Sequence, residues 1–103
     1  MTTQGHEFHA VRDVKVIGPY SLLLTFEDGF CREVDLSPIL HGRRFGPLRD
    51  PKLFRQVRLE PEFETIIWPT GADFDPETLY HWDRYLPYMK EMAQKWEQTG
   101  VNA

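Results

Sequence analysis

The sequence has a single cysteine and no long apolar run, and each shortage excludes a class of protein. Cys31 has no second cysteine in the 103 residues, so the chain cannot form an internal disulfide, which favours a reducing compartment. Because Cys31 falls within a predicted strand, we expect an inert, buried thiol. No run of about 18 apolar residues and no charged and apolar leader is present. We therefore expect a cytoplasmic protein that has no contact with membranes.

The 12 basic residues are outnumbered by 16 acidic ones, and complete catalytic motifs are missing. The net charge of −4 opposes nucleic acid, so we expect this chain alone to bind none. There is no Gly-x-Ser-x-Gly elbow, no His-Glu-x-x-His pair and no phosphate loop. Asp73, Asp75 and Glu77 alternate like the start of a calcium loop, but Thr78 and Arg84 occupy the places that need glycine and glutamate. We expect no cofactor and no metal.

Apolar and aromatic residues, in contrast, are abundant enough for one packed domain. Hydrophobic residues make up 41% of the chain and aromatic residues 14%. We expect a flexible tail over residues 1–9, an α+β domain over 10–82, and a C-terminal amphipathic helix over 83–103 that packs on the same domain. His6 and His9 in the tail have a spacing that metal ligands use, but no third ligand lies nearby in sequence.

An alternation of apolar and polar residues up to Leu36 predicts a three-stranded antiparallel meander. A three-residue loop between 20–26 and 30–36 keeps the apolar residues on one face, whereas a two-residue loop mixes charge into that face. We therefore expect Gly29 in a left-handed turn position with a bulge. This register pairs Leu24 with Arg32, and two interpretations of the arginine stay open. Its aliphatic stem covers the core face, or its guanidinium pairs with a carboxylate of the acidic bend around Asp73.

The rest of the chain predicts a second hairpin and several helices. Residues 57–59 and 63–68 are typical of strands. Three short helices are expected after Ser37, Asp50 and Asp75, each an N-cap residue followed by proline. The fold class is α+β: an antiparallel sheet of about five strands, a three-stranded meander plus a second hairpin, covered by short helices and the C-terminal amphipathic helix.

One stretch resembles a family signature. Residues 67–74, Ile-Trp-Pro-Thr-Gly-Ala-Asp-Phe, followed by Pro76-Glu77-x-Leu79-Tyr80, resemble the motif of a small bacterial family, domain of unknown function 2442. The resemblance covers roughly residues 11–80, and Thr70 stands where the family usually has asparagine. It implies a compact α+β domain with no established activity. It also implies a gene beside that of another small protein, in an arrangement like a toxin–antitoxin pair.

The sequence supports three hypotheses about function. The first is a non-enzymatic protein-interaction module, the antitoxin-like partner of a co-encoded small protein. Aromatic, methionine and acidic side chains anchor and orient partners, which suggests a contact set of Trp68, Asp73, Tyr80, Met89, Met92 and Trp96. The second is a small hydrolase or metal-dependent enzyme that uses Asp73, His81 and Asp83. The third is a homodimer that assembles through the C-terminal helix.

Overall fold

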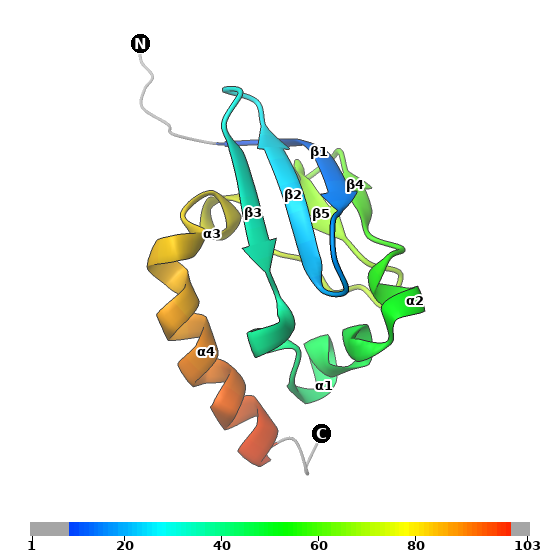
Figure 1. Ribbon diagram of the computed structural model, residues 1–103, viewed down its shortest axis with the longest axis vertical. Helices are drawn as coiled ribbons and strands as arrows, with labels where there is room; N and C mark the ends of the chain where they lie inside the picture. The colour runs from blue at the N-terminus through cyan, green and yellow to red at the C-terminus, as the bar shows by residue number, and fades with distance from the viewer. Residues whose placement is uncertain (1–8, 100–103) are drawn as a thin grey trace.

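The computed structural model describes residues 9–99, with side chains to residue 96, and its front layer in Figure 1 is a three-stranded sheet. The strands are β1 (Val11–Val16), β2 (Ser21–Phe26) and β3 (Cys31–Asp35), antiparallel and in the order β1-β2-β3. Side chains of β2 alternate between buried and half-buried, as a strand with one face on a core requires. The predicted meander is therefore confirmed.

The predicted register between β2 and β3 is also confirmed. Leu22 pairs with Val34 and Leu24 with Arg32. Gly29 has a φ of +91°, a left-handed conformation that glycine adopts without steric cost. The burial expected for Cys31 is wrong, because the thiol is exposed. Its register position places it on the outer face of the sheet, away from the core.

The second hairpin lies beside β1. It consists of β4 (Arg58–Glu60) and β5 (Thr65–Ile67), which form a two-stranded antiparallel sheet. The Val11 N–H donates to the carbonyl of Glu64 at 2.9 Å, which attaches the turn of this hairpin to the start of β1. The α+β class and the five strands are confirmed, and the strands are divided between two sheets.

Short helices connect and cover these strands. They are η1 (Ser37–Ile39), α1 (Gly42–Phe45), η2 (Gly46–Arg49), α2 (Pro51–Phe54) and α3 (Pro76–Tyr80). The cap predicted for Asp50 is confirmed, since its carboxylate accepts the Lys52 N–H at 3.0 Å. The cap predicted for Ser37 is wrong: Leu36 holds the N-cap position of η1, and the Asp35 carboxylate, two residues before Ser37, accepts the Ser37 N–H. Asp75 holds the N-cap position of α3, but its side chain makes no cap hydrogen bond.

The last element is α4 (Trp82–Thr99), which runs down the β3 side of the molecule in Figure 1. Its main contacts are with η1, α1 and α3. The side chains that it turns to the core recur at helical spacing: Trp82, Leu86, Met89, Ala93 and Trp96. None of the helices within residues 9–99 combines the length and the apolar composition that a membrane span requires.

Candidate functional site

The first residue of the predicted contact set, Trp68, lies inside the fold. Its side chain is 1% exposed, and its indole Nε1–H donates to the carbonyl of Phe54 at 2.8 Å. The ring also packs against Phe54 and Phe74 at centroid distances of 5.7 and 6.1 Å. Since a buried indole usually has such a partner, these contacts account for Trp68 as a part of the core.

The three residues of the enzyme hypothesis make separate pairs. Asp73 accepts a hydrogen bond from Arg44 at 2.7 Å. Asp83 lies 3.6 Å from Arg32, and His81 lies 3.7 Å from Glu77. These three residues do not form a cluster that could hold a metal ion. Such a cluster, as found within residues 9–99, has at least three His, Cys, Asp or Glu ligand atoms within 4.8 Å of one another.

The predicted contact residues of α4 are half-buried. Met89 and Trp96 pack on the core, and the Trp96 ring lies 5.7 Å from that of Phe45. Met92 is half-buried, while Tyr85 and Tyr88 on the same helix are 37% and 57% exposed. At about 100° per residue, Tyr85, Tyr88 and Met92 form a stripe along one flank of the core-facing side chains.

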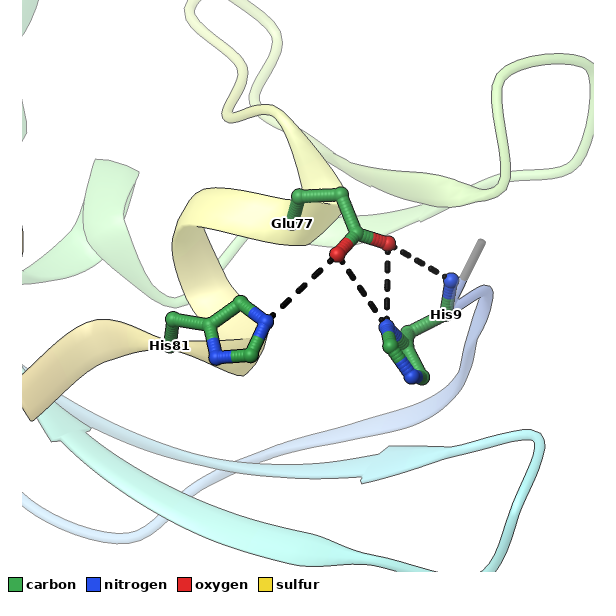
Figure 2. Close-up of side chains that lie close together, drawn as sticks. All are labelled: His9, Glu77 and His81. Carbon is green, nitrogen blue, oxygen red and sulfur yellow. Dashed lines mark hydrogen bonds and ion pairs between the residues drawn. The ribbon is translucent and has the colours of Figure 1, made fainter. Parts of the chain in front are cut away.

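Two histidines and a glutamate gather where the chain enters β1 and leaves α3 (Figure 2). His9 lies directly before β1, Glu77 is in the first turn of α3, and His81 caps the end of α3. The Nδ1 of His9 is 3.1 and 3.0 Å from the two carboxylate oxygens of Glu77, and the backbone N–H of His9 donates to Oε2 at 2.8 Å. The Nε2 of His81 is 3.7 Å from Oε1. One carboxylate therefore faces both imidazoles.

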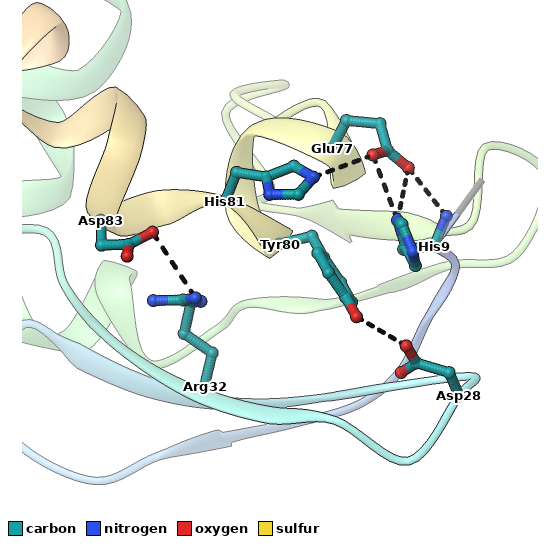
Figure 3. Close-up of polar contacts among 7 residues, drawn as sticks. All are labelled: His9, Asp28, Arg32, Glu77, Tyr80, His81 and Asp83. Atoms are coloured by element: carbon teal, nitrogen blue, oxygen red, sulfur yellow. Dashed lines mark hydrogen bonds and ion pairs between the residues drawn. The ribbon is translucent and has the colours of Figure 1, made fainter. Parts of the chain in front are cut away.

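Tyr80 joins this cluster to the β2–β3 turn (Figure 3). Its ring stacks on His9 with a centroid distance of 3.6 Å, and its hydroxyl donates to Asp28 Oδ2 at 2.6 Å. This hydrogen bond, followed by one from the Phe30 N–H, lowers the pKa of Asp28 below its ordinary value. The same hydrogen bond raises the pKa of Tyr80. The contact thus favours an ionised carboxylate beside a neutral phenol.

Arg32 is a third polar feature, on the same side of the molecule as the histidine cluster and the contact between Tyr80 and Asp28 (Figure 3). Its guanidinium lies 3.6 Å from Asp83 and 5.0 Å from the Phe30 ring centroid. Its side chain is 21% exposed, and its buried Nε makes no hydrogen bond to any described residue. Of the two interpretations from the sequence, the pairing with a carboxylate of the acidic bend is wrong, because Arg44 takes Asp73 and Arg32 takes Asp83.

The cluster of His9, Glu77 and His81 was missed because its main contact joins residues 68 positions apart. The sequence assigned His9 to a tail and Glu77 to the dipole of a helix start, and no local pattern links the two. The domain boundary at residue 10 stays a prediction, and residues 1–8 lie outside the described residues. The spacing of four between Glu77 and His81 was the available signal, since such residues share a helix face.

A second surface feature is an open hollow beside the β4–β5 turn. Its lining includes four acidic residues, and Phe63 contributes a side chain that is 64% exposed. The carboxylates come from two segments of the chain: Glu62, Glu64, Asp73 and Asp75. Asp73 is paired with Arg44, so three of the four have no ion pair among those found in residues 9–99.

Comparison with protein-family models gives a match over residues 11–85, to a family described as a protein of unknown function, DUF2442. The match covers all five strands and ends within the first residues of α4. Comparison with curated proteins and comparison with solved structures each found no match.

Proposed function

Since the chain belongs to the DUF2442 family of proteins of unknown function, we propose a function from its own surface: a non-enzymatic protein-interaction module that binds a basic protein partner. The partner in this proposal is a small protein encoded by a neighbouring gene, which the module neutralises as an antitoxin does. The observation that carries the proposal is the acidic hollow with Phe63 at its rim.

The composition of the hollow suits a partner that presents lysine or arginine beside an apolar side chain. The three carboxylates without an ion pair among the described residues attract and orient cationic groups. The exposed ring of Phe63 supplies apolar area that a partner buries on binding. The net charge of −4 adds attraction for a basic protein and repulsion between two copies of this chain. A basic heterologous partner is therefore favoured over self-association.

The backbone of Glu64 adds support. Its φ is +58°, in the left-handed region where glycine and asparagine are far more common than glutamate. Such a conformation costs on the order of 1 kcal/mol, and strained residues cluster at functional sites. A glutamate kept in this position places a carboxylate in the lining of the hollow.

The test is co-expression with each protein encoded by an adjacent gene, followed by size-exclusion chromatography and titration calorimetry. The variant Glu62→Lys/Asp75→Lys reverses two charges of the hollow that make no ion pair with the described side chains. The matched control is Glu33→Lys/Glu91→Lys, which makes the same change in net charge at two exposed positions outside the hollow. Thermal unfolding of both variants checks that each is folded.

Binding of one adjacent gene product to the wild type and the control, with a loss of at least about tenfold for the hollow variant, supports the proposal. If no adjacent gene product binds the wild-type chain, the proposal is overturned. Equal losses for the hollow variant and the control overturn it as well, because they reflect net charge and not the hollow.

A second candidate is a homodimer formed through α4, favoured by the stripe of Tyr85, Tyr88 and Met92. Two large aromatic side chains exposed on consecutive turns are suited to pairing with a second helix. Light scattering over a range of concentrations tests this candidate, with Tyr88→Glu as the disrupting variant. A species that remains monomeric at all concentrations ends it.

A further inference from the structure

We propose that His9, Glu77 and His81 form a binding site for a divalent transition-metal ion of the zinc type. Each residue offers one ligand atom, and the three atoms lie within 4.8 Å of one another. The site lies outside the acidic hollow, so the proposal stands independently of the protein-interaction function.

The distances are close to those of a metal shell. Zinc holds nitrogen and oxygen ligands at about 2.0–2.2 Å, which puts neighbouring ligand atoms about 3.0–3.6 Å apart in tetrahedral or octahedral geometry. The His9 Nδ1 lies 3.0 Å from Glu77 Oε2, and the His81 Nε2 lies 3.7 Å from Oε1. All three ligand atoms lie within 4.8 Å of one another, so side-chain rotations that bring them about 1–2 Å closer would give the spacing of a metal shell.

The ligand types select the class of metal. Imidazole nitrogens suit zinc, copper, nickel and iron, whereas calcium and magnesium prefer an all-oxygen shell. Two histidines and a glutamate are also the protein ligands of one type of zinc site that keeps a fourth position open. An ion at this place would have at least one position for water or for a ligand from another molecule.

The fold holds all three groups before any ion arrives. Glu77 and His81 are four residues apart on α3, so both project from the same side of one short helix (Figure 2). His9 is fixed by its backbone hydrogen bond to Glu77 and by its stacking on Tyr80. Because the ligands are already positioned, little conformational entropy is lost on binding.

Two histidines and a glutamate can form hydrogen bonds with one another in a protein that binds no metal. Protons also compete with a metal ion for the same imidazole nitrogens. The distinguishing property is therefore direct binding of a metal ion, with each of the three side chains contributing. If His9, Glu77 and His81 bind the ion together, the affinity for the metal depends strongly on all three residues. If zinc binds nonspecifically to the surface, its affinity does not depend on any one of these residues.

The experiment titrates chelator-treated, full-length protein without a histidine tag with Zn²⁺ by calorimetry, and with Co²⁺ by visible absorption. The variants are His9→Ala, His81→Ala and Glu77→Gln, the last of which keeps the size of the side chain. The matched control is His41→Ala, since His41 is a half-buried histidine outside the cluster. His6→Ala, in the segment outside the described residues, is a second control. Circular dichroism checks folding.

We expect one equivalent of Zn²⁺ to bind to the wild type and to both controls, with Co²⁺ absorption bands of a nitrogen and oxygen shell. Each cluster variant should weaken binding on the order of tenfold or more, since even outer-shell changes cost that much. No saturable binding to the wild type overturns the proposal. So does a loss for His41→Ala as large as that for the cluster variants. If His81→Ala unfolds, retained affinity in Glu77→Gln is enough to overturn it.

Discussion

The indole of Trp68 donates a buried hydrogen bond of 2.8 Å to the backbone carbonyl of Phe54. This bond joins two different parts of the fold. Phe54 ends α2, and Trp68 follows β5 directly. Both side chains are almost fully buried, so this bond ties the second hairpin to the layer of short helices. The bend after β5 is thereby fixed from its inner side.

Truncation of Trp68 should therefore act on stability. Trp68→Ala is expected to lower the free energy of unfolding by about 3–5 kcal/mol, and Trp68→Phe by less, because the phenyl ring keeps most of the packing. Trp68→Phe also removes the shorter of two hydrogen bonds to the Phe54 carbonyl, which the Val57 N–H still contacts at 3.4 Å, so this loss should cost about 0.5–1.5 kcal/mol. Urea unfolding measures both. Tyr88→Ala, at an exposed position, should change stability by less than about 0.5 kcal/mol, and an equal loss there would contradict the assignment.

Local patterns in the sequence were sufficient to predict most of the fold. The register of β2 and β3 follows from the alternation of side chains, since a shift by one residue turns Leu22 and Leu24 outward. The helix start at Asp50 follows from the geometry of the cap itself. The same reasoning fails at Ser37, which is the first residue of η1 and not its N-cap: Leu36 holds that position, and Asp35 accepts the Ser37 N–H. A list of preferred cap residues does not show that this helix begins one residue earlier than the Ser-Pro pair predicts.

The candidate sites required tertiary contacts that no local pattern contains. The sequence placed Trp68 and Asp73 in a predicted contact set, and the structure gives each a hydrogen-bond partner from another segment of the chain. The contact between His9 and Glu77 depends on where the entry to β1 passes α3. The hollow likewise depends on how the β4–β5 turn lies against the acidic bend. These arrangements follow from packing, and the sequence shows only their components.

The contact between Tyr80 and Asp28 should be visible as a pH effect. Removal of the hydroxyl in Tyr80→Phe is expected to raise the pKa of Asp28 toward its ordinary value of 3.8. Because the folded pKa of Asp28 lies below the unfolded value, its stabilising contribution is present above the unfolded pKa and is lost as the pH falls through the folded one. NMR titration of the Asp28 carboxyl measures the shift. Tyr88→Phe is the control, and an equal shift there would contradict the pairing.

Gly42 should resist substitution more strongly than Gly29. Both have positive φ, +80° and +91°, so alanine pays a similar backbone cost of roughly 1–2 kcal/mol at each. Only at Gly42 does an added Cβ meet another side chain, the Cβ of Trp96 at 2.9 Å. We expect Gly42→Ala to lose more stability than Gly29→Ala in urea unfolding, because α4 must move. Equal losses would show that α4 is not held against α1 at this point.

Glu64 should show opposite effects on stability and on partner binding. Glu64→Asn keeps a polar side chain and suits the φ of +58° better, so it should raise the free energy of unfolding by up to about 1 kcal/mol. It also removes one carboxylate from the hollow and should weaken binding of a basic partner. Thermal unfolding and calorimetry measure the two quantities. A variant that is more stable and binds equally well would separate the strain from the proposed function.

Arg32 offers a test of how a partly buried charge contributes to the fold. Its Nε is buried without a hydrogen bond to the described residues, and its ion pair with Asp83 is 3.6 Å long and largely exposed on the Asp83 side. Exposed pairs contribute at most about 1 kcal/mol, whereas a buried unpaired polar atom costs about 1–3 kcal/mol. Arg32→Met keeps the packing of the stem on the core face and removes that atom.

We therefore expect Arg32→Met to leave the free energy of unfolding unchanged or to raise it by on the order of 1 kcal/mol. Asp83→Asn should lower it by less than about 1 kcal/mol, because only the weak pair is lost. Urea unfolding of both variants and of Arg32→Ala, which also loses the packing, separates the two contributions. A loss for Arg32→Met as large as that for Arg32→Ala would show that the guanidinium, through Asp83 and the Phe30 ring, stabilises β3 more than burial of its Nε costs.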